Sequence, residues 1–150
     1  MEYTFATLTS SDVAALKDLL RVFGEAFEDV DTYQGAIPSD AYLRSLLATP
    51  TFIVVVARQG DEVVGGLAAY ELRKFERERS EIYIYDLAVA QEHRRRGVAT
   101  GAINELKRIA VARGAYVIFV QADRGDDPAI NLYEGLGTRE DVHHFDLRLD

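Results

Sequence analysis

A short basic loop between a predicted strand and a predicted helix has the residue types that bind phosphate. The strand ends with Leu87, Ala88 and Val89, the loop contains Arg94, Arg95 and Arg96, and the helix opens with Gly97, Val98, Ala99 and Thr100. The first N–H groups of a helix have no partner within it and lie at the positive end of its dipole. Glycine and alanine let an anion approach these groups, and arginines add charge-assisted hydrogen bonds. The loop therefore predicts a pyrophosphate site, with a solvated basic turn as the alternative.

Two carboxylates in the preceding strand have the chemistry to bind or deprotonate an amine. Asp86 stands immediately before Leu87, and Glu81 lies earlier in the same strand. A carboxylate can bind an ammonium through its charge or accept a proton from it. Strand alternation puts positions 81 and 86 on opposite faces, and only a bulge between them would aim both at one site. We predict Asp86 as ammonium ligand or base and keep Glu81 as the alternative.

Further carboxylates lie in predicted loops. They are Asp123, Asp126 and Asp127, before a helix that starts at Pro128, and Glu28 and Asp29, after the first helix. Several carboxylates around an ammonium bind a polyamine and also keep it protonated. The net charge of −8 suits a cationic substrate and argues against nucleic acid or an anionic membrane as partner, although acidic proteins are common. Helix capping is an alternative role for Asp126 and Asp127 that is compatible with binding.

The composition excludes several other kinds of site. The chain has no cysteine, which excludes disulfides, thiolate metal sites and a cysteine nucleophile and suits a cytoplasmic protein. Its apolar runs are far shorter than the roughly 20 residues of a membrane-spanning helix, and its first residues lack the layout of a signal peptide. The adjacent His143 and His144 would point to opposite faces of a strand, which is poor metal geometry. We expect no bound metal.

The elements that position these residues alternate along the chain. We expect strands at 3–8, 52–58, 62–70, 81–89, 115–122 and 143–149. We expect two helices that begin after caps at 10–12 and 39–40, and two further helices at 96–113 and 128–136. This order predicts one α/β domain over residues 1–150, with a mixed sheet flanked by helices. The central hairpin argues against a doubly wound Rossmann sheet.

Two motifs in this order resemble those of the GNAT superfamily of N-acetyltransferases. The basic loop at 94–99 is similar to its acetyl-CoA signature, Arg/Gln-x-x-Gly-x-Gly/Ala after a strand, and 129–137 is similar to its A-x-x-L-Y-E-x-L-G motif. The chain departs from the family pattern at Asp126, where Asn is usual, and at Thr138, where Phe is usual. The resemblance implies the GNAT fold over the whole chain and acetyl-CoA as co-substrate.

The resemblance also implies roles for individual residues. The strands ending at Val89 and starting at Tyr116 would splay apart, and the pantetheine arm would bond the backbone of residues 87–89 between them. The amides of residues 94–100 would hold the pyrophosphate, while Asp126 stands where the family has an Asn that contacts CoA. Tyr133 would protonate the departing thiolate. The amine would attack directly, without a covalent enzyme intermediate.

Longer segments resemble the aminoglycoside 3-N-acetyltransferases of type I. They include 74–76, 80–89, 114–118 and 125–129. This resemblance implies acetylation of the 3-amino group of an aminoglycoside antibiotic, antibiotic resistance and a homodimer. The alternatives are the same fold acting on a polyamine or on a peptide or protein amine, and a non-catalytic CoA-binding module. The many carboxylates favour a sugar that carries several amines.

Overall fold

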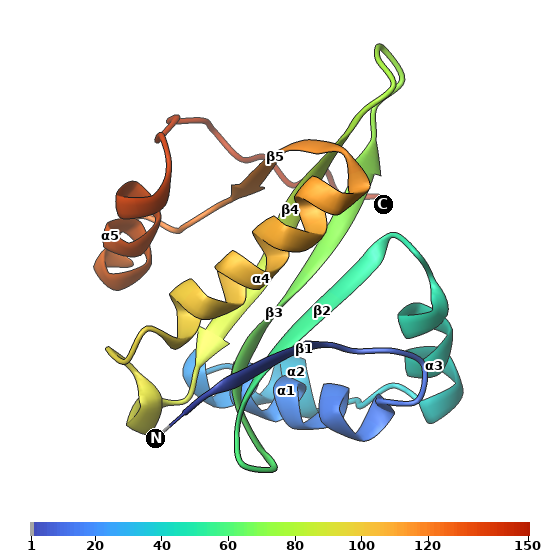
Figure 1. Cartoon of the computed structure of the whole chain (residues 1–150), viewed down its shortest axis with the longest axis vertical. Helices are drawn as coiled ribbons and strands as arrows, with labels where there is room; N and C mark the ends of the chain where they lie inside the picture. Colours follow the sequence, from blue (N-terminus) through green and yellow to red (C-terminus); the bar gives the residue numbers. More distant parts are fainter. Residues whose placement is uncertain (1) are drawn as a thin grey trace.

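A five-stranded mixed sheet forms the centre of the computed structural model, which describes residues 2–150 (Figure 1). The strands are β1 (Thr4–Thr7), β2 (Phe52–Gln59), β3 (Glu62–Arg73), β4 (Ser80–Val89) and β5 (Ala115–Val120), in that order across the sheet. Neighbouring strands are antiparallel except for β4 and β5, which are parallel. The predicted α/β fold with a mixed sheet and a central hairpin is confirmed.

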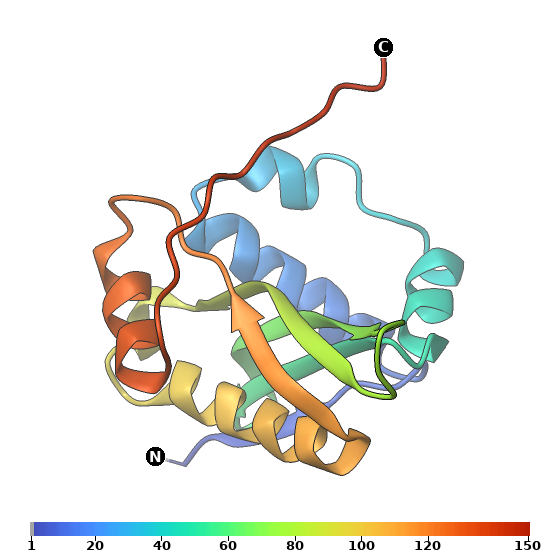
Figure 2. The ribbon, with the colours of Figure 1, turned by 90° about the horizontal axis from the view of Figure 1, so that it is seen from above.

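Helices cover both faces of this sheet. They are α1 (Val13–Ala26), α2 (Val30–Gln34), α3 (Asp40–Ala48), the 3-10 turn η1 (Gln91–His93), α4 (Val98–Arg113) and α5 (Asp127–Leu136). Figure 2 shows α1 along one face and α4 along the other. The helix α2 forms in a stretch that the sequence predicted to be a loop, and the carboxylate of Asp29 caps it by accepting a hydrogen bond from the backbone N–H of Thr32.

A large apolar core lies on each face of the sheet. Strand β2 supplies both, because alternate residues point to opposite faces. Val54 and Val56 pack with the residues of α1 and α3, whereas Ile53 and Val55 pack with those of α4. All four side chains are buried, which explains why this strand is apolar along its length rather than alternating.

Two glycines in the left-handed conformation bound α4. Gly97 precedes the helix with φ 80°, and Gly114 ends it with φ 76°. The helix therefore begins at Val98, slightly later than predicted from Arg96, because Gly97 lacks helical dihedral angles. The predicted glycine cap at position 114 is confirmed.

The predicted final strand at 143–149 is wrong. Residues 138–150 have no strand partner, and the chain end runs away from the sheet (Figure 2). Phe145, Leu147 and Leu149 are 80%, 84% and 103% exposed, so the alternating apolar pattern is real but has nothing to pack on. A strand requires a neighbouring strand to pair its backbone, and β5, at the edge of the sheet, pairs only with β4.

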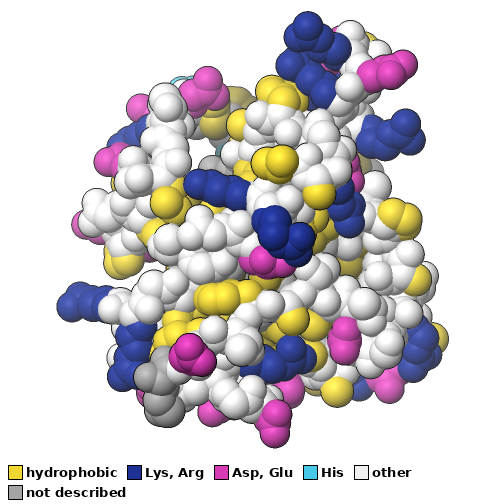
Figure 3. All heavy atoms as spheres, viewed as in Figure 1, with side chains coloured by type: hydrophobic (Ala, Val, Ile, Leu, Met, Phe, Trp, Pro, Cys, Tyr) yellow, Lys and Arg dark blue, Asp and Glu magenta, His cyan; other side chains and the backbone are white. Residues whose placement is uncertain are grey.

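The surface over α4 carries both charge signs. Lys and Arg side chains are interspersed with Asp and Glu from the β3–β4 hairpin to the opposite end of the molecule (Figure 3). Within residues 2–150, every helix is too short or too polar to cross a membrane.

Candidate functional site

Strand β5 is paired along its whole length, but it covers only the first half of β4. Their pairing extends from Ser80 opposite Ala115 to Ile84 opposite Val120. From Asp86 to Val89, β4 continues to pair with β3 on its other side only. The sheet therefore opens beyond Ile84 and leaves backbone groups of β4 available to an extended ligand.

The opening leads to the N-terminus of α4, whose backbone suits an anion. Both Arg95 (φ 62°) and Gly97 adopt left-handed conformations in the turn before the helix. No side chain caps α4, so the N–H groups of its first residues lack a capping partner. A Cβ built on Gly97 would meet nothing within 4 Å, so there is open space above this backbone. The predicted phosphate loop therefore fits a pyrophosphate.

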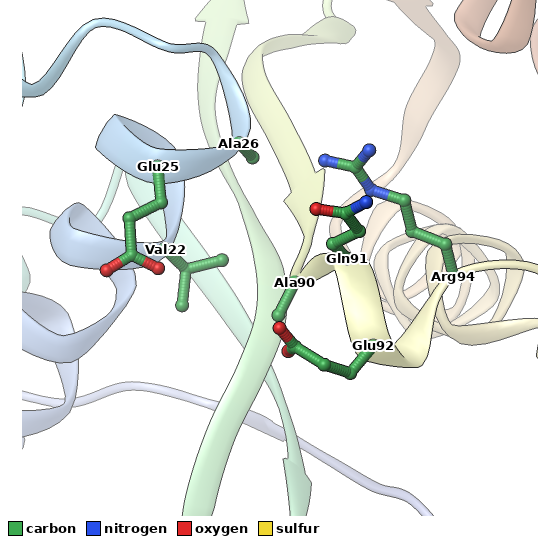
Figure 4. A pocket seen from close by; sticks show the side chains of 7 residues that line it. All are labelled: Val22, Glu25, Ala26, Ala90, Gln91, Glu92 and Arg94. Carbon is green, nitrogen blue, oxygen red and sulfur yellow. The ribbon is translucent and has the colours of Figure 1, made fainter.

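A small cavity borders this loop at the end of β4. It measures about 100 Å³ and is lined by Val22, Glu25 and Ala26 of α1 and by Ala90, Gln91, Glu92 and Arg94. In Figure 4, Arg94 and Gln91 face the α1 side chains across the cavity. The Nε of Arg94 also donates a hydrogen bond to the carbonyl of Val89 at 3.1 Å, which ties this arginine to the strand end. The cavity is smaller than the 300–1,000 Å³ usual for ligand pockets, so it is too small to hold a ligand of cofactor size.

A β-bulge in β4 determines where Asp86 points. Ala69 pairs with Ile84 and Ala68 with Asp86, so Tyr85 is an extra residue with no partner opposite it. Before the bulge, Ile84 packs on the α4 side, whereas Ala88 after it packs on the α1 side. The bulge thus turns Asp86 toward α1 and α2, onto the face that also carries Glu81.

Asp86 is partly buried on this face and is held by a tyrosine. The hydroxyl of Tyr33, on α2, donates a hydrogen bond to its Oδ2 at 3.1 Å. Burial raises the pKa of Asp86, and the hydrogen bond from Tyr33 opposes that rise. Burial and the neighbouring carboxylate raise the pKa of Tyr33 well above its usual range, so its hydroxyl remains a donor. The sequence reasoning missed this partner.

Glu81 lies on the same face but at the other end of β4. It accepts a hydrogen bond from the hydroxyl of Tyr116 at 3.0 Å, and the Nζ of Lys74 lies 3.7 Å from it. It belongs to the part of β4 that is still paired with β5. At about 3.3 Å per residue it is roughly 15 Å from Asp86 along the strand. The bulge therefore puts both carboxylates on one face without bringing them together.

Two of the acidic loop residues cap helices. Asp126 accepts a hydrogen bond from the N–H of Ala129 at 3.4 Å and caps α5. Asp29 caps α2, the helix that carries Tyr33. Asp123, Asp127 and Glu28 are exposed. The capping alternative is thus confirmed for Asp126.

Tyr133 lies on α5 against the apolar residues that border the opening. It packs on the same cluster as Leu87 of β4 and Val120 of β5. Burial, and to a smaller extent Asp126, raise the pKa of its hydroxyl. The hydroxyl therefore stays protonated at neutral pH and is chemically able to act as an acid.

Metal-binding clusters of three or more His, Cys, Asp or Glu residues are absent from residues 2–150. In the C-terminal segment, His144 contacts Asp146 at 2.8 Å. Since metal sites normally need more ligands, the pair alone gives no metal centre.

An opening between parallel strands that leads to an uncapped helix N-terminus suits an extended, phosphate-bearing ligand. Residues 15–138 match the acetyltransferase (GNAT) family, and the chain belongs to this family. Its acetyltransferases use acetyl-CoA as the donor.

Solved structures of two aminoglycoside acetyltransferases are similar over the full chain. One, from an uncultured soil metagenomic sample, is 56% identical with a TM-score of 0.98, and both chains are covered completely. Another from such a sample, in complex with sisomicin, is 31% identical with a TM-score of 0.92, covering 99% of this chain and 97% of that one. N-acetyltransferase family 8 member 2 of Rattus norvegicus is 28% identical over 90 residues, 60% of this chain. The chain spans 40% of the length of that relative.

Proposed function

We propose that this chain transfers the acetyl group of acetyl-CoA to the 3-amino group of an aminoglycoside. The observation that carries the proposal is the half-buried carboxylate of Asp86 beside the opening between β4 and β5. A carboxylate at this place can bind an ammonium and then accept its proton. The exposed carboxylates around the starts of α2 and α5 suit a substrate with several amines, and two similar structures are aminoglycoside acetyltransferases.

The donor would lie along β4 and the phosphate loop. Backbone groups of Leu87, Ala88 and Val89 would bond its pantetheine arm, and the amides from Arg94 to Thr100 its pyrophosphate. Bound acetyl-CoA supplies an activated thioester carbonyl. A backbone N–H near Leu87 or Val89 would stabilise the negative charge on that oxygen.

Two side chains would handle the protons. Asp86 takes a proton from the substrate ammonium, directly or through water, and so frees the nitrogen lone pair. As the new C–N bond forms and the C–S bond breaks, Tyr133 gives its hydroxyl proton to the departing sulfur. The second proton of the amine nitrogen then passes through water to the Tyr133 phenolate, and Asp86 releases its proton to solvent, so the protons balance without a covalent enzyme intermediate.

The contacts of the two strand carboxylates favour Asp86 over Glu81 as the base. Glu81 is already engaged with Lys74 and Tyr116 and lies where the sheet is closed. The matched variants Asp86→Asn and Glu81→Gln test this choice, because each removes one charge from the same face. We expect the loss of kcat/KM to be much larger for Asp86→Asn.

The substrate is tested by measuring thiol release from acetyl-CoA with gentamicin, kanamycin, spermidine and a lysine peptide. Turnover of aminoglycosides, with the product acetylated at the 3-amine by NMR, is the expected result. Expression in a sensitive bacterium should then raise resistance, with the enzyme acting as one domain in the cytoplasm, where acetyl-CoA is available. Turnover of spermidine alone or of the peptide alone would show that a polyamine or a peptide amine, and not an aminoglycoside, is the substrate. Tight acetyl-CoA binding without any turnover would indicate a CoA-binding module.

The unpaired C-terminal segment supports the further proposal of a homodimer. Phe145, Leu147 and Leu149 alternate along it and are exposed, and β5 presents an unpaired edge with Tyr116 and Val117 48% and 41% exposed. An apolar strand and an open sheet edge in one chain can satisfy each other reciprocally between two copies. We propose that each copy adds its C-terminal segment to β5 of the other.

Light scattering after gel filtration tests this arrangement. We expect a dimer for the full chain and a monomer when Phe145 and Leu147 are both replaced by Glu. Arg148→Ser, on the other face of the same segment, is the matched control and should remain dimeric. A monomeric full chain would overturn the proposal.

A further inference from the structure

A hydrogen bond connects the short helix α2 to the bulge of β4. Its donor is Tyr33 and its acceptor is Oδ2 of Asp86, at 3.1 Å. The two residues are 53 positions apart in the chain. Within residues 2–150, the side chain of Asp86 accepts no other hydrogen bond, so its Oδ1 has no protein partner there.

The ring of Tyr33 is held firmly behind this hydroxyl. Its centroid lies 6.0 Å from that of Phe23 and 5.7 Å from that of Phe27. A Cβ on Gly24 would approach the Cβ of Tyr33 to 3.2 Å, so the glycine leaves α2 the room to sit close to α1. Asp29 caps α2 just before the tyrosine. The hydroxyl therefore has a defined position relative to β4.

We propose that Tyr33 is a positioning residue, whose hydroxyl fixes Oδ2 of Asp86 so that Oδ1 is presented to the acceptor amine. The inference rests on the proposed function, in which Asp86 takes the proton of the amine. On this proposal, α1 and α2 cover the sheet and also orient Asp86. A carboxylate held by one oxygen loses fewer rotational states when the substrate arrives.

The groups around Asp86 indicate what the loss of this hydroxyl would do. Tyr33 on α2 contacts it and the bulge residue Tyr85 precedes it, while the charge of Asp86 helps to raise the pKa of Tyr70 on β3 and of Tyr83 on β4. Of these, Tyr33 donates the hydrogen bond, which favours the ionised carboxylate. Without that bond, burial would act unopposed and the pKa of Asp86 would rise. The base would then become protonated at a higher pH.

The variant Tyr33→Phe removes the hydroxyl and keeps the ring between Phe23 and Phe27. We expect kcat/KM for the aminoglycoside to fall about tenfold, with the acid limb of its pH profile moved up by about 0.5–1 pH unit. The KM for acetyl-CoA should stay unchanged. Tyr70→Phe is the matched control, because it removes a hydroxyl from the same neighbourhood without a bond to Asp86, and its acid limb should not move.

A measurement that needs no substrate separates this inference from the proposed function. The carboxyl carbon of Asp86, assigned by comparison with Asp86→Asn, can be titrated by NMR in the wild-type chain and in Tyr33→Phe. A higher pKa in the variant supports the positioning role even if aminoglycosides prove to be poor substrates. An unchanged pKa would overturn it, as would an unshifted acid limb in an active enzyme.

Discussion

Replacing Gly97 by alanine tests the phosphate loop, because the chain provides its own control. Gly97 and Gly114 bound the same helix, and their φ angles are 80° and 76°. A Cβ at either position would meet nothing within 4 Å. Alanine at either site therefore causes no clash within the protein but must adopt a left-handed conformation, which costs about 1–2 kcal/mol. Both variants should lose this much stability, roughly 2–8 °C in melting temperature.

The two variants should differ sharply in ligand binding. The space above Gly97 is where we place the pyrophosphate, so a methyl group there keeps the phosphate from the amides of α4. Losing one hydrogen bond to a charged group costs about 1.5–3 kcal/mol, which corresponds to roughly a 10- to 150-fold weaker Kd. Gly114 lies at the other end of the helix and should not affect binding.

Calorimetric titration with acetyl-CoA, beside thermal melts of both variants, gives the comparison. We expect equal losses of stability and a weaker Kd for Gly97→Ala alone. If both variants bound acetyl-CoA as the wild type does, or both lost affinity equally, the assignment of the loop would be refuted.

Three other changes test the site and the fold. Tyr133→Phe should lower kcat more than about tenfold with little change in acetyl-CoA affinity, and unchanged turnover would remove the hydroxyl from the mechanism. In the wild type, burial raises the pKa of Asp86, so kcat/KM should fall on acidification at a pH above the usual carboxyl range; a profile flat through pH 5 would contradict this. Burial raises the pKa of Glu71, but the hydrogen bonds from Ser80 and Arg113 lower it by more, so the pKa of Glu71 lies below its usual value. Its stabilisation is therefore present above the unfolded pKa and lost as pH falls, and Glu71→Gln should cost about 1–3 kcal/mol by urea unfolding at pH 7 but little at pH 3.

The phosphate loop and its helix could be predicted because their signals are local. Arginines, a glycine and an apolar helical stripe within one stretch specify a strand end, a turn and an N-terminus without reference to the rest of the chain. The signal for the helix end is equally local, because the last turn closes with a residue in the left-handed conformation and Gly114 adopts it readily. The order of the elements then led to the mixed sheet.

The surroundings of Asp86 could not be predicted in this way. Its partner Tyr33 comes from a short helix in a stretch that reads as a loop, and no spacing relates the two residues. Likewise, the apolar alternation at 143–149 is typical of a strand, but pattern alone does not say whether a partner strand is available within the same chain. Both depend on tertiary packing rather than on local sequence.

One irregularity accounts for both halves of the candidate site. Ile84 is the last residue of β4 paired with β5, and the bulge at Tyr85 follows at once. A regular strand would have turned Asp86 toward the apolar core under α4, where an ionised carboxylate would be costly. The extra residue instead directs Asp86 to α2 and brings Leu87 into the α4 core. The point where β4 leaves β5 is thus also the point where the alternation of its side chains is reversed, and this places the carboxylate of Asp86 beside the opening.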